Sequence, residues 1–164
     1  MRQPISRILA AALALAALAG PAFAGVVEEK NKAIARKVLE EVLGQGKIEE
    51  NESIYSPGFV VHNETRDAGR EEDRAATRGW RQAFPDLKIT VDKIIAEGDL
   101  VAVRFFAEGT NTGTGNGIPA TGKSIHLSAV SIFRIVDGKV TDEWTAFDSL
   151  RLIQQLGLPV PDPR

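Results

Sequence analysis

Three polar side chains in this sequence combine the chemistry and the setting needed to move a proton. Asp148 ends an apolar strand-like run, and a carboxyl group there can act as a general acid or base. His62 and Asn63 follow a second, shorter apolar run. A histidine titrates near neutral pH, and an asparagine amide can donate a hydrogen bond to a developing oxyanion. Carbanion chemistry on a carbonyl compound needs a base and a donor for the oxygen, and this trio could supply both, with Asp148 moving the proton and His62 and Asn63 steadying the oxygen.

Asp148 has two interpretations. Trp144 and Ala146 precede it at intervals of two residues, so in a regular strand all three side chains share one face. Trp144 would then contact an apolar ligand, and its bulk would exclude water and raise the pKa of the acid. Alternatively, Asp148 caps the helix that follows it, since aspartate is a preferred N-cap residue.

The other candidates also have structural alternatives. His62 could be an ordinary histidine at a strand end, and Asn63 could make the turn that follows. His126 is a candidate ligand contact, with a solvent-facing or core position as its alternative. His62, Glu64 and His126 also match the residue types of a two-histidine, one-carboxylate iron site. Such a site normally lies in a double-sheet barrel, and the sequence has no cysteine and two histidines, so we expect neither metal nor cofactor.

A hairpin over residues 124–148 has to position Asp148. Its first strand has apolar residues in both phases, which predicts a central strand. Asp137-Gly138 then predicts a type I′ turn, because both central residues of that turn need positive φ.

The remaining elements predict one α+β domain, in which a curved antiparallel sheet packs its concave face on N-terminal helices. Helical spacing of apolar residues and Gly or Pro boundaries predict helices over 27–43, 48–55, 69–84 and 149–156. Strands are predicted over 59–62, 87–96 and 100–108, with a bulge near Asp92-Lys93 where the apolar phase switches. The Gly- and Thr-rich segment 109–122 is predicted to be a loop over a pocket.

Composition limits the partners. The chain carries a formal net charge of −2 and has no Lys/Arg cluster, which argues against a nucleic-acid partner, because phosphate binding needs a concentrated basic face. Without cysteine there can be no disulfide bond, so the apolar core alone has to stabilise the domain.

The first 24 residues have the pattern of a cleaved secretory signal. Arg2 and Arg7 precede the apolar run 8–19, and Ala22-Phe23-Ala24 provides small residues for cleavage. We therefore expect a mature domain over 25–164, periplasmic or secreted, with no membrane association after cleavage.

Several short motifs, in order, resemble the SnoaL-like polyketide cyclases, also called ester cyclases. The motifs are Phe59-Val60-Val61-His62-Asn63, Gly69-Arg70-Glu71, Ala83-Phe84-Pro85-Asp86-Leu87, Ala96-Glu97-Gly98-Asp99, Gly117-Ile118-Pro119-Ala120-Thr121-Gly122-Lys123, Ile132-Phe133-Arg134, Asp137-Gly138-Lys139 and Glu143-Trp144 to Asp148. The resemblance implies the cone-shaped α+β fold shared with nuclear transport factor 2 and ketosteroid isomerase, commonly as a dimer. It also implies a pocket aspartate, here Asp148, that closes a ring by intramolecular aldol chemistry without cofactor or metal.

Two functions remain open from the sequence. The chain could be a cofactor-free cyclase, isomerase or lyase acting on a small hydrophobic carbonyl compound. It could instead be a non-catalytic periplasmic protein that binds a small ligand in the same pocket, since export separates it from biosynthetic enzymes.

A homodimer is expected through the outer face of the sheet. The central strands have apolar residues in both phases, and the helices can cover only one face. The other face, with Phe105 or Phe133 as expected members, would leave a large apolar patch on a monomer.

Overall fold

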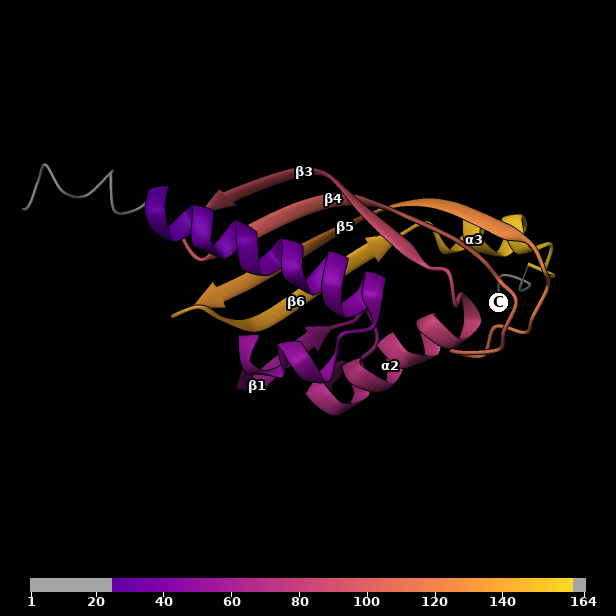
Figure 1. Ribbon diagram of the computed structural model, residues 1–164, viewed down its shortest axis with the longest axis horizontal. Helices are drawn as coiled ribbons and strands as arrows, with labels where there is room; N and C mark the ends of the chain where they lie inside the picture. The colour runs from indigo at the N-terminus through magenta and orange to yellow at the C-terminus, as the bar shows by residue number, and fades with distance from the viewer. Residues whose placement is uncertain (1–24, 161–164) are drawn as a thin grey trace, which may run out of the picture.

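A computed structural model describes residues 25–160, in which the N-terminal helix lies across the inner face of one curved sheet (Figure 1). The N-terminal helix covers 25–45 and includes a π-helical part, η1 (Val38–Leu43). A 3-10 helix, η2 (Glu49–Ile54), precedes the first strand. Two further helices are α2 (Arg70–Ala83) and α3 (Ser149–Leu156). The predicted signal segment lies outside the described residues.

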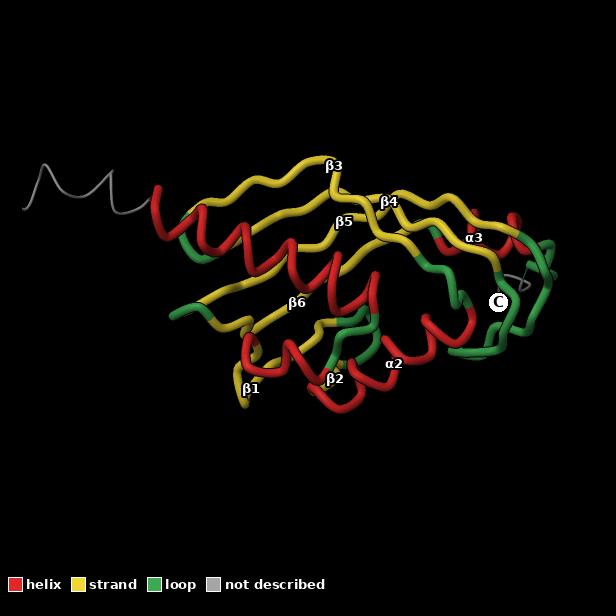
Figure 2. The backbone as a smooth tube through the Cα atoms, viewed as in Figure 1, coloured by secondary structure: helices red, strands yellow, loops and turns green. Residues whose placement is uncertain are grey.

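The sheet has the strand order β2-β1-β6-β5-β4-β3 (Figure 2). Its strands are β1 (Tyr55–His62), β2 (Asp67–Gly69), β3 (Lys88–Glu97), β4 (Leu100–Thr110), β5 (Ser124–Val136) and β6 (Lys139–Phe147). All neighbours pair antiparallel except β1 and β6, which are parallel. The α+β class and curved sheet are confirmed, while β2 and the parallel pair were not predicted.

The predicted hairpin is present. Asp137 and Gly138 both have positive φ, 50° and 74°, as a type I′ turn requires. Along β5, buried and exposed residues alternate almost without interruption. This regular strand therefore has a clear inner face, on the core, and a clear outer face.

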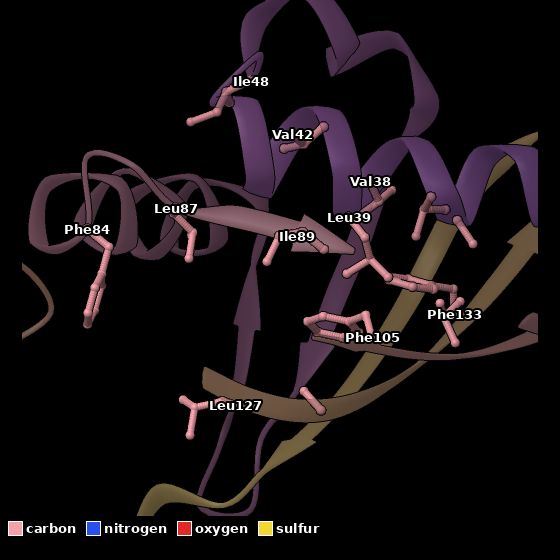
Figure 3. Close-up of a cluster of buried hydrophobic side chains, with 14 of the residues drawn as sticks. Val38, Leu39, Val42, Ile48, Phe84, Leu87, Ile89, Phe105, Leu127 and Phe133 are labelled. Atoms are coloured by element: carbon pink, nitrogen blue, oxygen red, sulfur yellow. The ribbon is translucent and has the colours of Figure 1, made fainter. Parts of the chain in front are cut away.

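The core lies between the N-terminal helix and the inner face of the sheet (Figure 3). Val38, Leu39 and Val42 of the helix are buried with the strand residues Phe105, Leu127 and Phe133. Burial of such side chains stabilises each by about 1.5–3 kcal/mol relative to exposure.

The residues expected on the outer face of the sheet are not the ones found there. Phe105 and Phe133 both lie on the inner face, where they are 3% and 0% exposed. The apolar outer face is formed instead by residues in the opposite phase, including Val130 and Ile132, which are 43% and 39% exposed.

The segment 109–122 packs along α2. Asn111 is fully buried and donates a hydrogen bond to the Ala83 carbonyl, and Asn116 donates one to the Ala76 carbonyl. The segment thereby fixes the position of α2, which contributes side chains to the interior. Among the described residues, no helix is long and apolar enough to cross a membrane.

Candidate active site

A bulge in β6 decides which of its side chains reach the interior. Ile135 pairs with Val140 while Arg134 pairs with Asp142, so Thr141 is an extra residue in β6. One extra residue reverses the faces of all that follow. Val140 is fully buried, but Glu143 and Thr145 face inward beyond the bulge, and Trp144 lies on the outer face.

The interior contains a cavity of about 200 Å³ between the N-terminal helix, α2 and β6. Its polar lining includes Tyr55, Asn63, Asp73, Glu143 and Thr145. A second hollow of about 100 Å³ shares Leu43, Trp80, Thr145 and Phe147 with it and is otherwise apolar, with Leu87, Ile89, Phe105, Ala107, Ile125, Leu127 and Ala129. The two hollows adjoin at these four shared residues, so a polar hollow and an apolar hollow lie next to each other.

Glu143 is the inward-facing carboxyl of β6, and burial raises its pKa to about 7. The negative charge of Asp73 raises this pKa further, while Arg70 and a hydrogen bond donated by Thr145, at 2.9 Å, act in the opposite direction. Ser131, fully buried on β5, lies 2.5 Å from the Thr145 hydroxyl and continues this hydrogen-bonded row. A carboxyl with a pKa near neutrality suits general acid–base catalysis.

Asp73 is the second acid of the cavity and lies in the first turn of α2. Burial raises its pKa, although the neighbouring Arg70 guanidinium lowers it in part. Arg70 binds Asp73 with one nitrogen and Glu52 with two others. The cation is therefore shared between two carboxylates, which leaves Glu143 without a direct ion-pair partner in the described structure.

Asp148 occupies the N-cap of α3. Its carboxylate accepts a hydrogen bond from the Arg151 backbone N–H at 2.8 Å, which satisfies one of the free donors of the first turn. The side chain is exposed and borders a shallow outer hollow with Arg104 and Val130. The structure thus shows the capping contact and does not bring Asp148 to the cavity; its catalytic role stays a prediction.

His62 and Trp144 meet on the outer face. Their rings stack with centroids 4.6 Å apart. The two imidazole nitrogens lie 3.1 Å from Asp67 and 2.8 Å from Asp142, and the hydrogen bond with Asp142 raises the pKa of His62. The structure places both residues on the face opposite Glu143, so their predicted roles are not supported by a position in the cavity.

Asn63 lies in the cavity, whereas His126 lies outside it. Asn63 lines the cavity and also its mouth, a wider hollow that includes Asp73, Ala76 and Asn116. His126 is exposed on β5, where it contacts Glu108 at 2.9 Å and stacks on Phe106. Of the five predicted site residues, Asn63 alone reaches the cavity.

The iron-site alternative is not supported by this arrangement. His62 contacts Asp67 and Asp142, whereas His126 contacts Glu108. Over residues 25–160, no group of three or more His, Cys, Asp or Glu side chains could hold a metal ion together.

Glu143, Asp73 and Tyr55 were missed by the sequence reasoning. One signal could have indicated the bulge behind Glu143. With Thr141 excluded from pairing, Ser131 faces Thr145 and Ile132 faces Trp144, so polar meets polar and apolar meets apolar. Regular pairing would instead have opposed Ser131 and Trp144.

The sequence profile of the SnoaL-like polyketide cyclases matches residues 33–156. All the residues that line the cavity fall within this range. The chain belongs to the SnoaL-like polyketide cyclase family. This confirms the family resemblance and agrees with cyclase-type catalysis.

One curated relative and two solved structures illustrate what the chain is similar to. Aklanonic acid methyl ester cyclase DnrD of Streptomyces peucetius is 34% identical over 111 residues, which cover 66% of this chain and 74% of DnrD. The crystal structure of AclR from Streptomyces galilaeus, provisionally described as a hydroxylase, is 28% identical with a TM-score of 0.73 and covers 84% of this chain and 86% of AclR. A crystal structure from Jannaschia sp. CCS1, provisionally assigned as a SnoaL-like polyketide cyclase, shares the fold with a TM-score of 0.74. It is 24% identical, and the match covers 81% of this chain and 95% of that chain.

Proposed function

We propose that this SnoaL-like protein catalyses cofactor-free proton transfer on a small hydrophobic carbonyl compound, with ring closure of the aldol type as its reaction. The single observation behind the proposal is the inward position of Glu143, whose pKa is raised to about 7 in a polar cavity that adjoins an apolar hollow. As carboxylate, Glu143 accepts a proton from the carbon next to the carbonyl group. As acid, it returns a proton to the oxygen formed on ring closure.

The cavity accounts for the orientation of such a substrate. Apolar parts of the molecule would lie among Ile89, Phe105 and Leu127, and the reacting carbonyl would lie in the polar hollow that carries Glu143. Asn63, at the mouth, can donate a hydrogen bond to a polar substituent. Exclusion of water from the apolar hollow strengthens the polar interactions in the adjoining one.

The proposal can be tested without the natural substrate. An aromatic ketone such as alpha-tetralone in deuterium oxide exchanges its alpha-hydrogens when a base removes them, and proton NMR follows the exchange. We expect the protein to accelerate it and Glu143→Gln to lose roughly a hundredfold or more of that acceleration. Asp148→Asn, which keeps a capping oxygen outside the cavity, is the matched control.

The outcomes separate the alternatives. Loss of acceleration in Asp148→Asn but not in Glu143→Gln would restore Asp148 as the catalytic acid. Binding of the ketone without acceleration by the unmodified protein would favour the ligand-binding alternative.

We further propose export and dimerisation, on the grounds given by the sequence and the outer face. Residues 1–24 would be removed, and the domain from Gly25 would act in the periplasm or outside the cell. N-terminal sequencing of protein from the native host tests this, and an intact Met1 would contradict it. Two copies would associate through the exposed apolar residues of β5.

A further inference from the structure

Tyr55 lines the cavity and carries a hydroxyl group whose role is unexplained. The residue is 6% exposed and lines the same cavity as Glu143 and Asp73. Within residues 25–160 the Tyr55 hydroxyl makes no hydrogen bond. Its oxygen is nevertheless not completely enclosed by protein atoms. A nearly buried phenol that lines a cavity and whose hydroxyl has no partner in the protein has its donor free for a ligand.

Packing alone does not require this hydroxyl. The ring of Tyr55 contacts that of Phe59 edge to face, with centroids 5.0 Å apart at 80°. The Arg70 guanidinium lies over the Tyr55 ring, 3.5 Å from its centroid. A phenylalanine would make both contacts, whereas a buried hydroxyl without a partner is costly.

The surroundings keep Tyr55 protonated. Burial raises the pKa of its phenol well above the ordinary value, and the charge of Arg70 offsets this only in part. The carboxylates of Glu143, Asp73 and Glu52 also disfavour a phenolate. Tyr55 is thus an O–H donor throughout the pH range in which Glu143 titrates.

We propose that Tyr55 is a catalytic residue whose hydroxyl donates a hydrogen bond to the substrate's carbonyl oxygen while Glu143 removes the proton from the adjacent carbon. The proposal rests on the proposed function. The C–H bond breaks, its proton passes to the Glu143 carboxylate, and its electron pair forms the carbon–carbon double bond of the enolate. The carbonyl π pair moves to the oxygen, where the Tyr55 hydrogen bond stabilises the new charge.

Para-nitrophenol is a suitable probe, because its phenolate resembles an enolate and absorbs differently from the neutral phenol. Near pH 7, we expect the protein to bind it as phenolate with Glu143 protonated. Tyr55→Phe removes the donor and should weaken this binding roughly ten- to hundredfold, the effect of one hydrogen bond to a charged group. Thr90→Val, which removes an exposed hydroxyl from β3, should bind like the unmodified protein.

A second readout uses the fact that the sequence has one tyrosine. Biosynthetic replacement of tyrosine by fluorotyrosine therefore changes Tyr55 alone and makes its hydroxyl a stronger donor. Phenolate affinity should rise with fluorination if the hydroxyl contacts the oxygen, and should stay constant if Tyr55 only fills space. The melting temperature of Tyr55→Phe should be no lower than that of the unmodified protein, because no internal hydrogen bond is lost and an unpartnered buried hydroxyl is removed.

Glu143→Gln separates this inference from the proposed function. Affinity of the unmodified protein for the phenolate should fall above pH 7 as Glu143 ionises, and the neutral amide of Glu143→Gln should abolish that fall. If Glu143→Gln behaves so but neither Tyr55→Phe nor fluorotyrosine changes the affinity, Tyr55 is not the donor and the role of Glu143 stands. If Glu143→Gln keeps the pH dependence, the proposed function fails.

Discussion

Glu143 and Asp148 differ in their surroundings far more than in their chemistry. Glu143 lies in the cavity beside Asp73, and its pKa is raised by burial. Asp148 is exposed and holds the first turn of α3 through the Arg151 N–H. Because a carboxyl group needs contact with the substrate to move its proton, position favours Glu143 for catalysis and Asp148 for stability.

The raised pKa of Glu143 should make stability depend on pH. Between the ordinary value of 4.5 and about 7, the folded protein retains a proton that the unfolded chain releases. Stability therefore falls as pH rises through this window. Glu143→Gln should be as stable as the unmodified protein below the window and more stable above it, by roughly 1–3 kcal/mol. Urea unfolding at several pH values measures this, and parallel curves for the two proteins would contradict it.

Removal of the Asp148 carboxylate should act on α3 and not on the cavity. Asp148→Ala loses the cap and should lower the free energy of unfolding by about 1 kcal/mol. Asp148→Asn, which still accepts a hydrogen bond, should lose much less. Thermal unfolding of both variants provides the comparison; equal stability of Asp148→Ala and the unmodified protein would mean that the cap is not formed in solution.

At the scale of elements, two bulges show what sequence patterns can and cannot predict. The bulge in β3 between Val91 and Lys93 was predicted, because the apolar phase switches there. The bulge at Thr141 was not, because Val140 and Trp144 are both apolar and fit an unbroken alternation. Most helices and strands could be predicted from local patterns, whereas the site depended on a one-residue shift that only pairing with β5 determines.

The loop over residues 111–123 should be needed to hold α2 in place. A Cβ atom at Gly115 would lie 2.0 Å from the Gly79 carbonyl oxygen, a backbone atom that cannot move without shifting α2. Gly115→Ala should therefore destabilise the protein by about 1–3 kcal/mol. Gly58→Ala is the control, because its Cβ would meet only the Ser56 hydroxyl oxygen at 4.0 Å. Similar melting temperatures for the two variants would show that the loop yields easily.

At the scale of the whole molecule, the two faces of the sheet have different tasks. The inner face, with Phe105, Leu127 and Phe133, forms the core and part of the apolar hollow. The outer face leaves Val130 and Ile132 substantially exposed. Apolar residues in both phases of β5 were visible in the sequence, but which phase the helices cover could not be read from it.

The proposed dimer gives the outer face its partner. Ile132→Lys introduces a charge on this face and should convert a dimer into a monomer, since an unpaired charge in an apolar interface is costly. Val27→Lys, at an exposed site on the N-terminal helix and not on the outer face, is a control of the same type. Sedimentation at micromolar concentration measures the mass, and a monomeric unmodified protein would contradict the proposal.

The pH dependence of ketone deuteration tests the central claim most directly, namely that Glu143 performs the proton transfer in the cavity. We expect the rate for the unmodified protein to rise with pH, with a midpoint near 7 where Glu143 becomes a carboxylate, and to level off above it. Glu143→Gln should show only the low, uncatalysed rate across the range. A midpoint near 4.5, or a profile unchanged in Glu143→Gln, would assign the chemistry to another group.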